Sequence, residues 1–99
     1  MSDGLTDQQR LSIQQVFQSF PQIEQALLYG SRAMGRYRAG SDIDLTLRGV
    51  IDLSLLNKIS LSLDDLLLPY EIDLSVLLQI DNPDLRDHIQ RKGIVFYQA

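Results

Sequence analysis

The chain has 99 residues, of which 44% are hydrophobic and 22% charged, and its formal net charge is -4. This length supports one domain over residues 1–99 with one hydrophobic core and excludes two, and the absence of cysteine excludes disulfide frameworks and thiolate metal sites. The negative charge argues against electrostatic binding of long DNA or RNA. Because no run of about 18 apolar residues and no basic-then-apolar leader occurs, we expect a cytoplasmic protein without a membrane anchor.

The first half of the chain predicts one helix followed by two strands. Thr6 and Gln9 resemble a capping box, and apolar residues at helical spacing follow until Pro21. Residues 25–29 form a short apolar run and residues 42–48 alternate between polar and apolar, which is typical of strands. Since only a dozen residues join these two strands, we expect them to be antiparallel.

The second half predicts a helix over residues 52–68 with Asp52 as its N-cap, an alternating strand over 71–77, a helix over 82–92 and a short strand over 94–97. The expected fold class is therefore α+β (α/β). We expect a small mixed sheet of three to four strands with helices packed on one face.

Carboxylates gather on two of the predicted strands. Asp42 and Asp44 are two positions apart, so both project from the same face. If the second acidic strand is a parallel neighbour of the first, Asp73 lies on that face about one strand spacing from Asp44. At roughly 4 Å and an effective dielectric of about 20, each like-charge pair costs about 4 kcal/mol. A divalent cation removes this cost, so the three acids are candidate metal ligands.

A glycine and a basic loop accompany the acids. Gly30 allows close approach of the backbone to a phosphate, and amides at the turn that begins with Ser31 are expected to donate to it. Three arginines, Arg32, Arg36 and Arg38, are candidates for neutralising a triphosphate or a departing pyrophosphate. The alternatives are a plain strand-ending glycine with a capping serine, and a solvated basic loop.

Two further features have weaker interpretations. His88 is the only histidine and lies among polar residues, so it is interpreted as a surface residue without a zinc site or serine chemistry. Leu61 and Leu68 fall off the main apolar face of their predicted helix. Either they are ordinary exposed leucines, or they form an apolar patch for a partner subunit.

The pattern Gly30-Ser31, ten residues, then Asp42-Ile43-Asp44 resembles that of the minimal nucleotidyltransferases, which belong to the DNA polymerase β-like superfamily. This resemblance implies the nucleotidyltransferase fold, a nucleoside triphosphate (usually ATP) as substrate, and Mg²⁺, with two ions expected. It makes Asp42 and Asp44 metal ligands and assigns the triphosphate to Gly30 and Ser31.

In the same resemblance, Asp73 is the third carboxylate, which ligates the metal and helps to activate the attacking hydroxyl. Many minimal members have arginine where this chain has Met34, so Arg36 or Arg38 is expected to supply that phosphate contact.

Small members of this family are commonly paired with a HEPN-domain protein, often an RNase toxin. The resemblance therefore implies an antitoxin that transfers AMP from ATP to a tyrosine of a HEPN toxin, and a possible hetero-oligomer with it. One alternative is an antitoxin that neutralises its partner by contact alone. Another is a small-molecule nucleotidyltransferase, although such enzymes normally carry an extra acceptor-binding domain.

Overall fold

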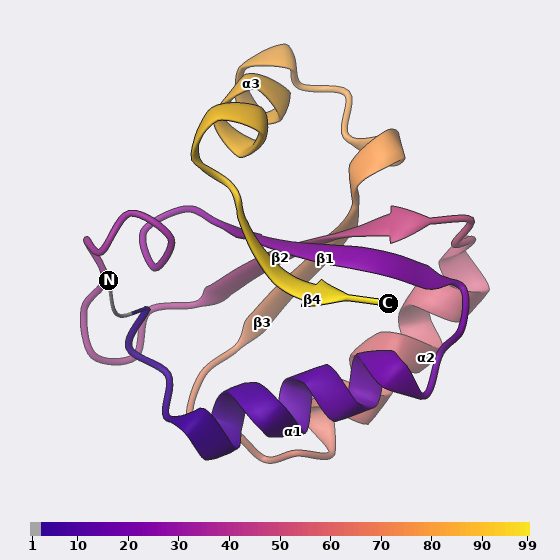
Figure 1. The fold of residues 1–99 in the computed structure, drawn as a ribbon, viewed down its shortest axis with the longest axis horizontal. Coiled ribbons are helices and arrows are strands. Elements are labelled where there is room, and N and C mark those ends of the chain that lie inside the picture. The colour runs from indigo at the N-terminus through magenta and orange to yellow at the C-terminus, as the bar shows by residue number, and fades with distance from the viewer. Residues whose placement is uncertain (1–2) are drawn as a thin grey trace.

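The computed structural model describes residues 3–99, which form a four-stranded mixed sheet with helices on both faces (Figure 1). The elements in chain order are α1 (Asp7–Gln18), β1 (Ile23–Tyr29), β2 (Ile43–Gly49), α2 (Leu53–Asp64), β3 (Ile72–Val76), the short 3₁₀ helix η1 (Leu77–Gln79), α3 (Pro83–Lys92) and β4 (Ile94–Gln98). The strand order is β3-β2-β1-β4. As predicted, β1 and β2 are antiparallel and β2 and β3 are parallel, and the α+β class is confirmed.

Helices α1 and α2 cover one face of the sheet, and the hydrophobic core lies between them and the strands (Figure 1). The fully buried positions at its centre come from both layers: Ile13, Phe17, Ile23, Ala26, Ile43, Leu45, Leu47 and Ile59. The central strand β2 contributes alternate residues to this core, because strand side chains repeat every two positions. Its intervening residues therefore face the other side of the sheet. No helix among residues 3–99 has the length and apolar character needed to cross a membrane.

Helix α3 lies on the opposite face, so the expectation that the helices share one face is wrong for this helix (Figure 1). It begins after Asn82, whose side chain accepts from the amides at 84 and 85, and it buries Ile89. The reason is that the outer face of β1 carries Leu27 and the largely buried Tyr29, which need an apolar cover. Helix α3 provides this cover and becomes one wall of the site described below.

The second helix ends earlier than predicted. Asp52 caps it as expected, accepting from the Leu55 amide at 2.8 Å, but α2 stops at Asp64 and not at residue 68. The chain turns at Leu67, which has a φ of 54°, and this turn brings Leu68 to pack against the core. Of the two off-face leucines, Leu61 is exposed and Leu68 is half-buried, so they do not form one exposed patch.

Leu67 holds a left-handed conformation while its side chain is 88% exposed. This conformation costs a non-glycine residue about 1–2 kcal/mol, whereas glycine loses about 0.5–1 kcal/mol more backbone entropy on folding. Leu67→Gly is therefore expected to raise the free energy of unfolding by about 0.5 kcal/mol in urea titrations. The matched change Leu61→Gly, inside α2, should lower it by about 1 kcal/mol. A loss of stability in Leu67→Gly would refute this account.

Candidate active site

The parallel pairing of β2 and β3 places Asp44 directly opposite Asp73. Asp42 immediately precedes β2 and lies close enough to Asp44 to act on it electrostatically. Asp42 and Asp73 are exposed and Asp44 is half-buried. The structure thus brings the three predicted carboxylates to the edge of the sheet where β2 and β3 begin.

Asp44 is the electrostatic centre of this group. Burial raises the pKa of its carboxyl above the ordinary value of 3.8, repulsion from Asp73 and Asp42 raises it further, and attraction to the cationic form of His88 opposes both effects. The charged form of Asp44 is therefore disfavoured by the folded protein itself. A bound cation would reverse this preference.

The chemistry of these donors fits a hard divalent cation. Carboxylate oxygens are the ligands that Mg²⁺ prefers, and no salt bridge within residues 3–99 occupies any of the three acids. In the same part of the chain, no three His, Cys, Asp or Glu side chains are arranged so that they could hold a metal ion as they stand. By the chemistry of their donors, Asp42, Asp44 and Asp73 remain the candidate residues for an ion, which would take the rest of its ligands from water or substrate.

The turn after β1 lies against the Asp44 carboxylate. Gly30 has a φ of 78°, and a Cβ at this position would collide with Oδ2 of Asp44. The Gly30 carbonyl accepts from the Met34 amide at 3.2 Å, whereas the amides of Ser31 and Arg32 have no acceptor within residues 3–99. The positive φ therefore favours glycine here, any larger residue would displace the Asp44 carboxylate, and the turn presents free amides beside the acids.

Arg32 does not take the position expected of a phosphate ligand. Its side chain is 2% exposed, and its guanidinium donates to the Ser41 carbonyl at 3.1 and 2.8 Å and to the Asp3 carbonyl at 2.9 Å. It also lies 5.2 Å from the ring centroid of Tyr37 and 4.4 Å from that of Tyr70. Arg32 therefore ties together the N-terminal segment, the loop before Asp42 and the loop before β3, because its three nitrogens donate to two of these segments and its cation lies over the Tyr70 ring of the third.

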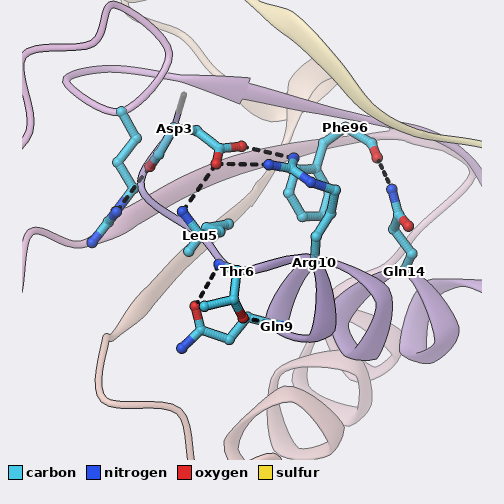
Figure 2. A network of polar contacts seen from close by, with 8 residues as sticks. Asp3, Leu5, Thr6, Gln9, Arg10, Gln14 and Phe96 are labelled. Atoms are coloured by element: carbon cyan, nitrogen blue, oxygen red, sulfur yellow. Dashed lines mark hydrogen bonds and ion pairs between the residues drawn. The ribbon is translucent and has the colours of Figure 1, made fainter. Parts of the chain in front are cut away.

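The N-terminal segment that Arg32 holds is itself anchored to α1 (Figure 2). Asp3 forms an ion pair with Arg10 at 2.7 Å and accepts from the Leu5 amide at 3.0 Å. Burial raises the pKa of Asp3, but the hydrogen bonds from Arg10 and Leu5 outweigh it, so the pKa lies below 3.8. Arg10 also lies over the Phe96 ring of β4.

The other two arginines remain available to a ligand. Arg36 and Arg38 are exposed, and their guanidinium groups have no hydrogen-bond or ion-pair partner in the described part of the chain. Their backbone amides shape the loop instead: that of Arg36 donates to the Ser31 carbonyl at 2.8 Å, and that of Arg38 donates to Oγ of Ser41 at 2.8 Å. In the sequence, the half-buried Met34 lies between Ser31 and Arg36.

Two residues of this site were not identified from the sequence. His88, interpreted as a surface residue, is half-buried, and its Nε2 accepts from the Gly30 amide at 3.1 Å. Tyr29 lies opposite Asp44 in the sheet, and burial together with Asp73 and Asp44 raises the pKa of its hydroxyl, while a hydrogen bond with Ser75 opposes this. Two sequence features could have indicated them: His88 is adjacent to the apolar Ile89, and Tyr29 directly precedes Gly30.

The structure thus combines a mixed sheet, acids at the start of two adjacent parallel strands, and a glycine turn beside them. A family profile described as "Polymerase beta, Nucleotidyltransferase" matches residues 12–99. The chain belongs to this family. A sequence comparison with curated proteins gives no significant match.

Several solved structures of similar fold are described as toxin–antitoxin structures. A "toxin-antitoxin with AMP-PNP" has a TM-score of 0.72 at 18% identity, covering 96% of this chain and 75% of that one. The "toxin-antitoxin MntA-HepT" gives 0.70 at 16% identity, with 95% and 74% covered. A complex of a tri-AMPylated Shewanella oneidensis HEPN toxin with its MNT antitoxin gives 0.62 at 18% identity, with 92% and 73% covered. At these identities the likeness confirms the expected fold.

Proposed function

We propose that this protein is a Mg²⁺-dependent nucleotidyltransferase that transfers AMP from ATP to a tyrosine hydroxyl of a HEPN-type toxin, acting as its antitoxin in a hetero-oligomer. The observation that carries the proposal is the pairing of Asp44 with Asp73, with the Gly30 turn against the same carboxylate. Support for the partner and the transferred group comes from similar folds described with AMP-PNP and with an AMPylated HEPN toxin.

In the proposed reaction, the acceptor hydroxyl attacks the α-phosphorus of ATP, its new P–O bond forms as the bond to the β-phosphate oxygen breaks, and pyrophosphate leaves. Asp73 accepts the hydroxyl proton, since it is exposed and lies beside Asp44. Asp42 and Asp44 hold the metal with Asp73. When bound, Mg²⁺ supplies charge stabilisation to the attacking and leaving oxygens.

The triphosphate is assigned to the basic side of the site. The free amides of Ser31 and Arg32 donate to phosphate oxygens, and the exposed side chains of Arg36 and Arg38 offset the charge of the departing pyrophosphate. Arg32 contributes only its backbone amide, because its guanidinium is buried and donates to the Ser41 and Asp3 carbonyls.

The test is transfer of label from [α-³²P]ATP to the HEPN-type partner in the presence of Mg²⁺, measured by gel autoradiography. The wild-type protein should label the partner, and Asp42→Asn should not. Asp52→Asn is the matched control: it changes a carboxylate at the α2 N-cap, where asparagine caps equally well, and should label normally. A folded wild-type protein that labels no partner would contradict the proposal.

Neutralisation by contact is the competing function, and exposed leucines on α2 favour it. Leu53 and Leu61 are 69% and 64% exposed. If contact alone is the function, Asp42→Asn should still neutralise the partner, whereas Leu61→Asp should not. If the proposed transfer is the function, Leu61→Asp should still neutralise the partner in a growth-rescue assay, and Asp42→Asn should not.

A further inference from the structure

His88 connects α3 to the turn that begins the nucleotide site. Its Nε2 accepts the Gly30 amide proton at 3.1 Å, across 58 positions of sequence. The contact is the one interaction by which a side chain of α3 reaches the Gly30–Ser31 turn within residues 3–99. A histidine placed on this amide therefore has a direct effect on the shape of the turn.

The Gly30 amide determines how the turn presents its other donors. Gly30 adopts a positive φ of 78°, and a glycine can move between backbone orientations at little steric cost. Once its amide is bound to His88, the peptide plane before Gly30 has one orientation. The following amides, those of Ser31 and Arg32, then remain free for a ligand.

The His88 ring is held in place from two sides. It packs edge-on against Tyr29, with ring centroids 6.3 Å apart and an interplanar angle of 74°, and Tyr29 is itself only 7% exposed. The next residue, Ile89, is 3% exposed and fixes α3 on the sheet. The acceptor nitrogen is thus carried by a supported side chain.

We propose that His88 is a positioning residue for nucleotide binding: through its Nε2 it holds the Gly30 amide, and so keeps the next two amides directed toward the triphosphate. This rests on the proposed function, because it assigns the triphosphate to that turn. It makes α3 part of the nucleotide site, although α3 carries none of the three acids.

Two substitutions of His88 test the acceptor nitrogen and the aromatic ring independently. His88→Phe keeps an aromatic ring against Tyr29 but removes the acceptor, and His88→Gln restores an acceptor at a similar distance along the side chain. We expect His88→Phe to weaken binding of AMP-PNP with Mg²⁺ by about fivefold in calorimetry, the size expected for one net hydrogen bond. His88→Gln should recover most of this loss, and Gln90→Ala, an exposed change on the same helix, should have no effect.

The ¹⁵N–¹H signal of Gly30 reports the contact without any nucleotide. It should move in His88→Phe and stay near its wild-type position in His88→Gln and Gln90→Ala. An unmoved Gly30 signal in His88→Phe would overturn the contact, and a moved signal with unchanged AMP-PNP affinity would overturn the positioning role. A wild-type protein that binds no AMP-PNP would refute both the proposed function and this role. In that case the Gly30 signal would still move in His88→Phe, which separates this outcome from the absence of the His88 contact.

Discussion

Replacing Asp44 with asparagine is expected to reduce nucleotidyl transfer by at least about 10³-fold and, at the same time, to increase the stability of the fold at neutral pH. The loss follows from the proposed role of Asp44 as a metal ligand, because the metal's charge stabilisation would be worth several kcal/mol in the transition state. The gain follows because asparagine has no charge to be buried and none to be repelled by Asp73 and Asp42. Initial rates of AMP transfer and urea unfolding at pH 7 measure the two effects.

The gain in stability should depend on pH in one direction. The pKa of Asp44 in the folded state lies above its ordinary value of 3.8, so folding favours the protonated carboxyl. The stability provided by that proton is complete below about pH 3.8 and is lost as the pH rises through the folded-state pKa. The advantage of Asp44→Asn over the wild type should therefore vanish at low pH and grow as the pH rises.

A control in the loop between η1 and α3 separates the local effects on Asp44 from a change in net charge. Asp81→Asn removes one exposed carboxylate and should change neither stability nor its pH dependence beyond about 0.5 kcal/mol. Mg²⁺ should stabilise the wild type more than Asp44→Asn, because only the wild type has the complete acidic group. A destabilised Asp44→Asn at pH 7 would contradict the assigned repulsion.

Replacing Arg32 with methionine should have the largest effect on stability, lowering the free energy of unfolding by about 3 kcal/mol. The change removes three hydrogen bonds and leaves the carbonyls of Ser41 and Asp3 without a donor. It also removes the cation from between Tyr37 and Tyr70. Denaturant unfolding followed by circular dichroism provides the measurement.

The same change should impair the site, because Ser41 directly precedes Asp42 and its carbonyl is held by Arg32. Arg32→Lys keeps the charge but lacks the planar fork, so it should fold and still transfer AMP more slowly than the wild type. Arg91→Met is the matched control: it breaks the exposed ion pair with Asp87 and should cost less than about 1 kcal/mol. An equal loss in the two methionine variants would contradict the bracing role of Arg32.

Local patterns predicted those parts of the site that depend on short-range geometry. The two-residue spacing of Asp42 and Asp44 places them together on any strand, and parallel pairing then brings in Asp73, as observed. The capping box at Thr6 and the N-cap at Asp52 are formed by residues three positions apart, and both occur as predicted. The caps and the Asp42–Asp44 spacing need no knowledge of distant parts of the chain, whereas the pairing of Asp44 with Asp73 depends on the parallel register of β2 and β3.

The roles of Arg32 and His88 could not be predicted in this way. An arginine next to Gly30-Ser31 has the same local pattern whether its side chain faces a phosphate or the protein interior, and only the packing of Tyr37, Tyr70 and Asp3 around it decides this. His88 joined the site because α3 packs on the face opposite to α1 and α2.

For this protein, the sequence by itself determined the order of the elements, the family to which the chain belongs and the placement of Asp42 and Asp44 on one strand face, since spacing along a strand and the Gly-Ser turn are local properties. Tertiary structure alone decided that the Arg32 side chain holds the loop before Asp42 and that α3 contacts the Gly30 turn. The physical reason is that burial and hydrogen bonding between distant segments depend on how the layers pack, and local periodicity carries no record of that packing.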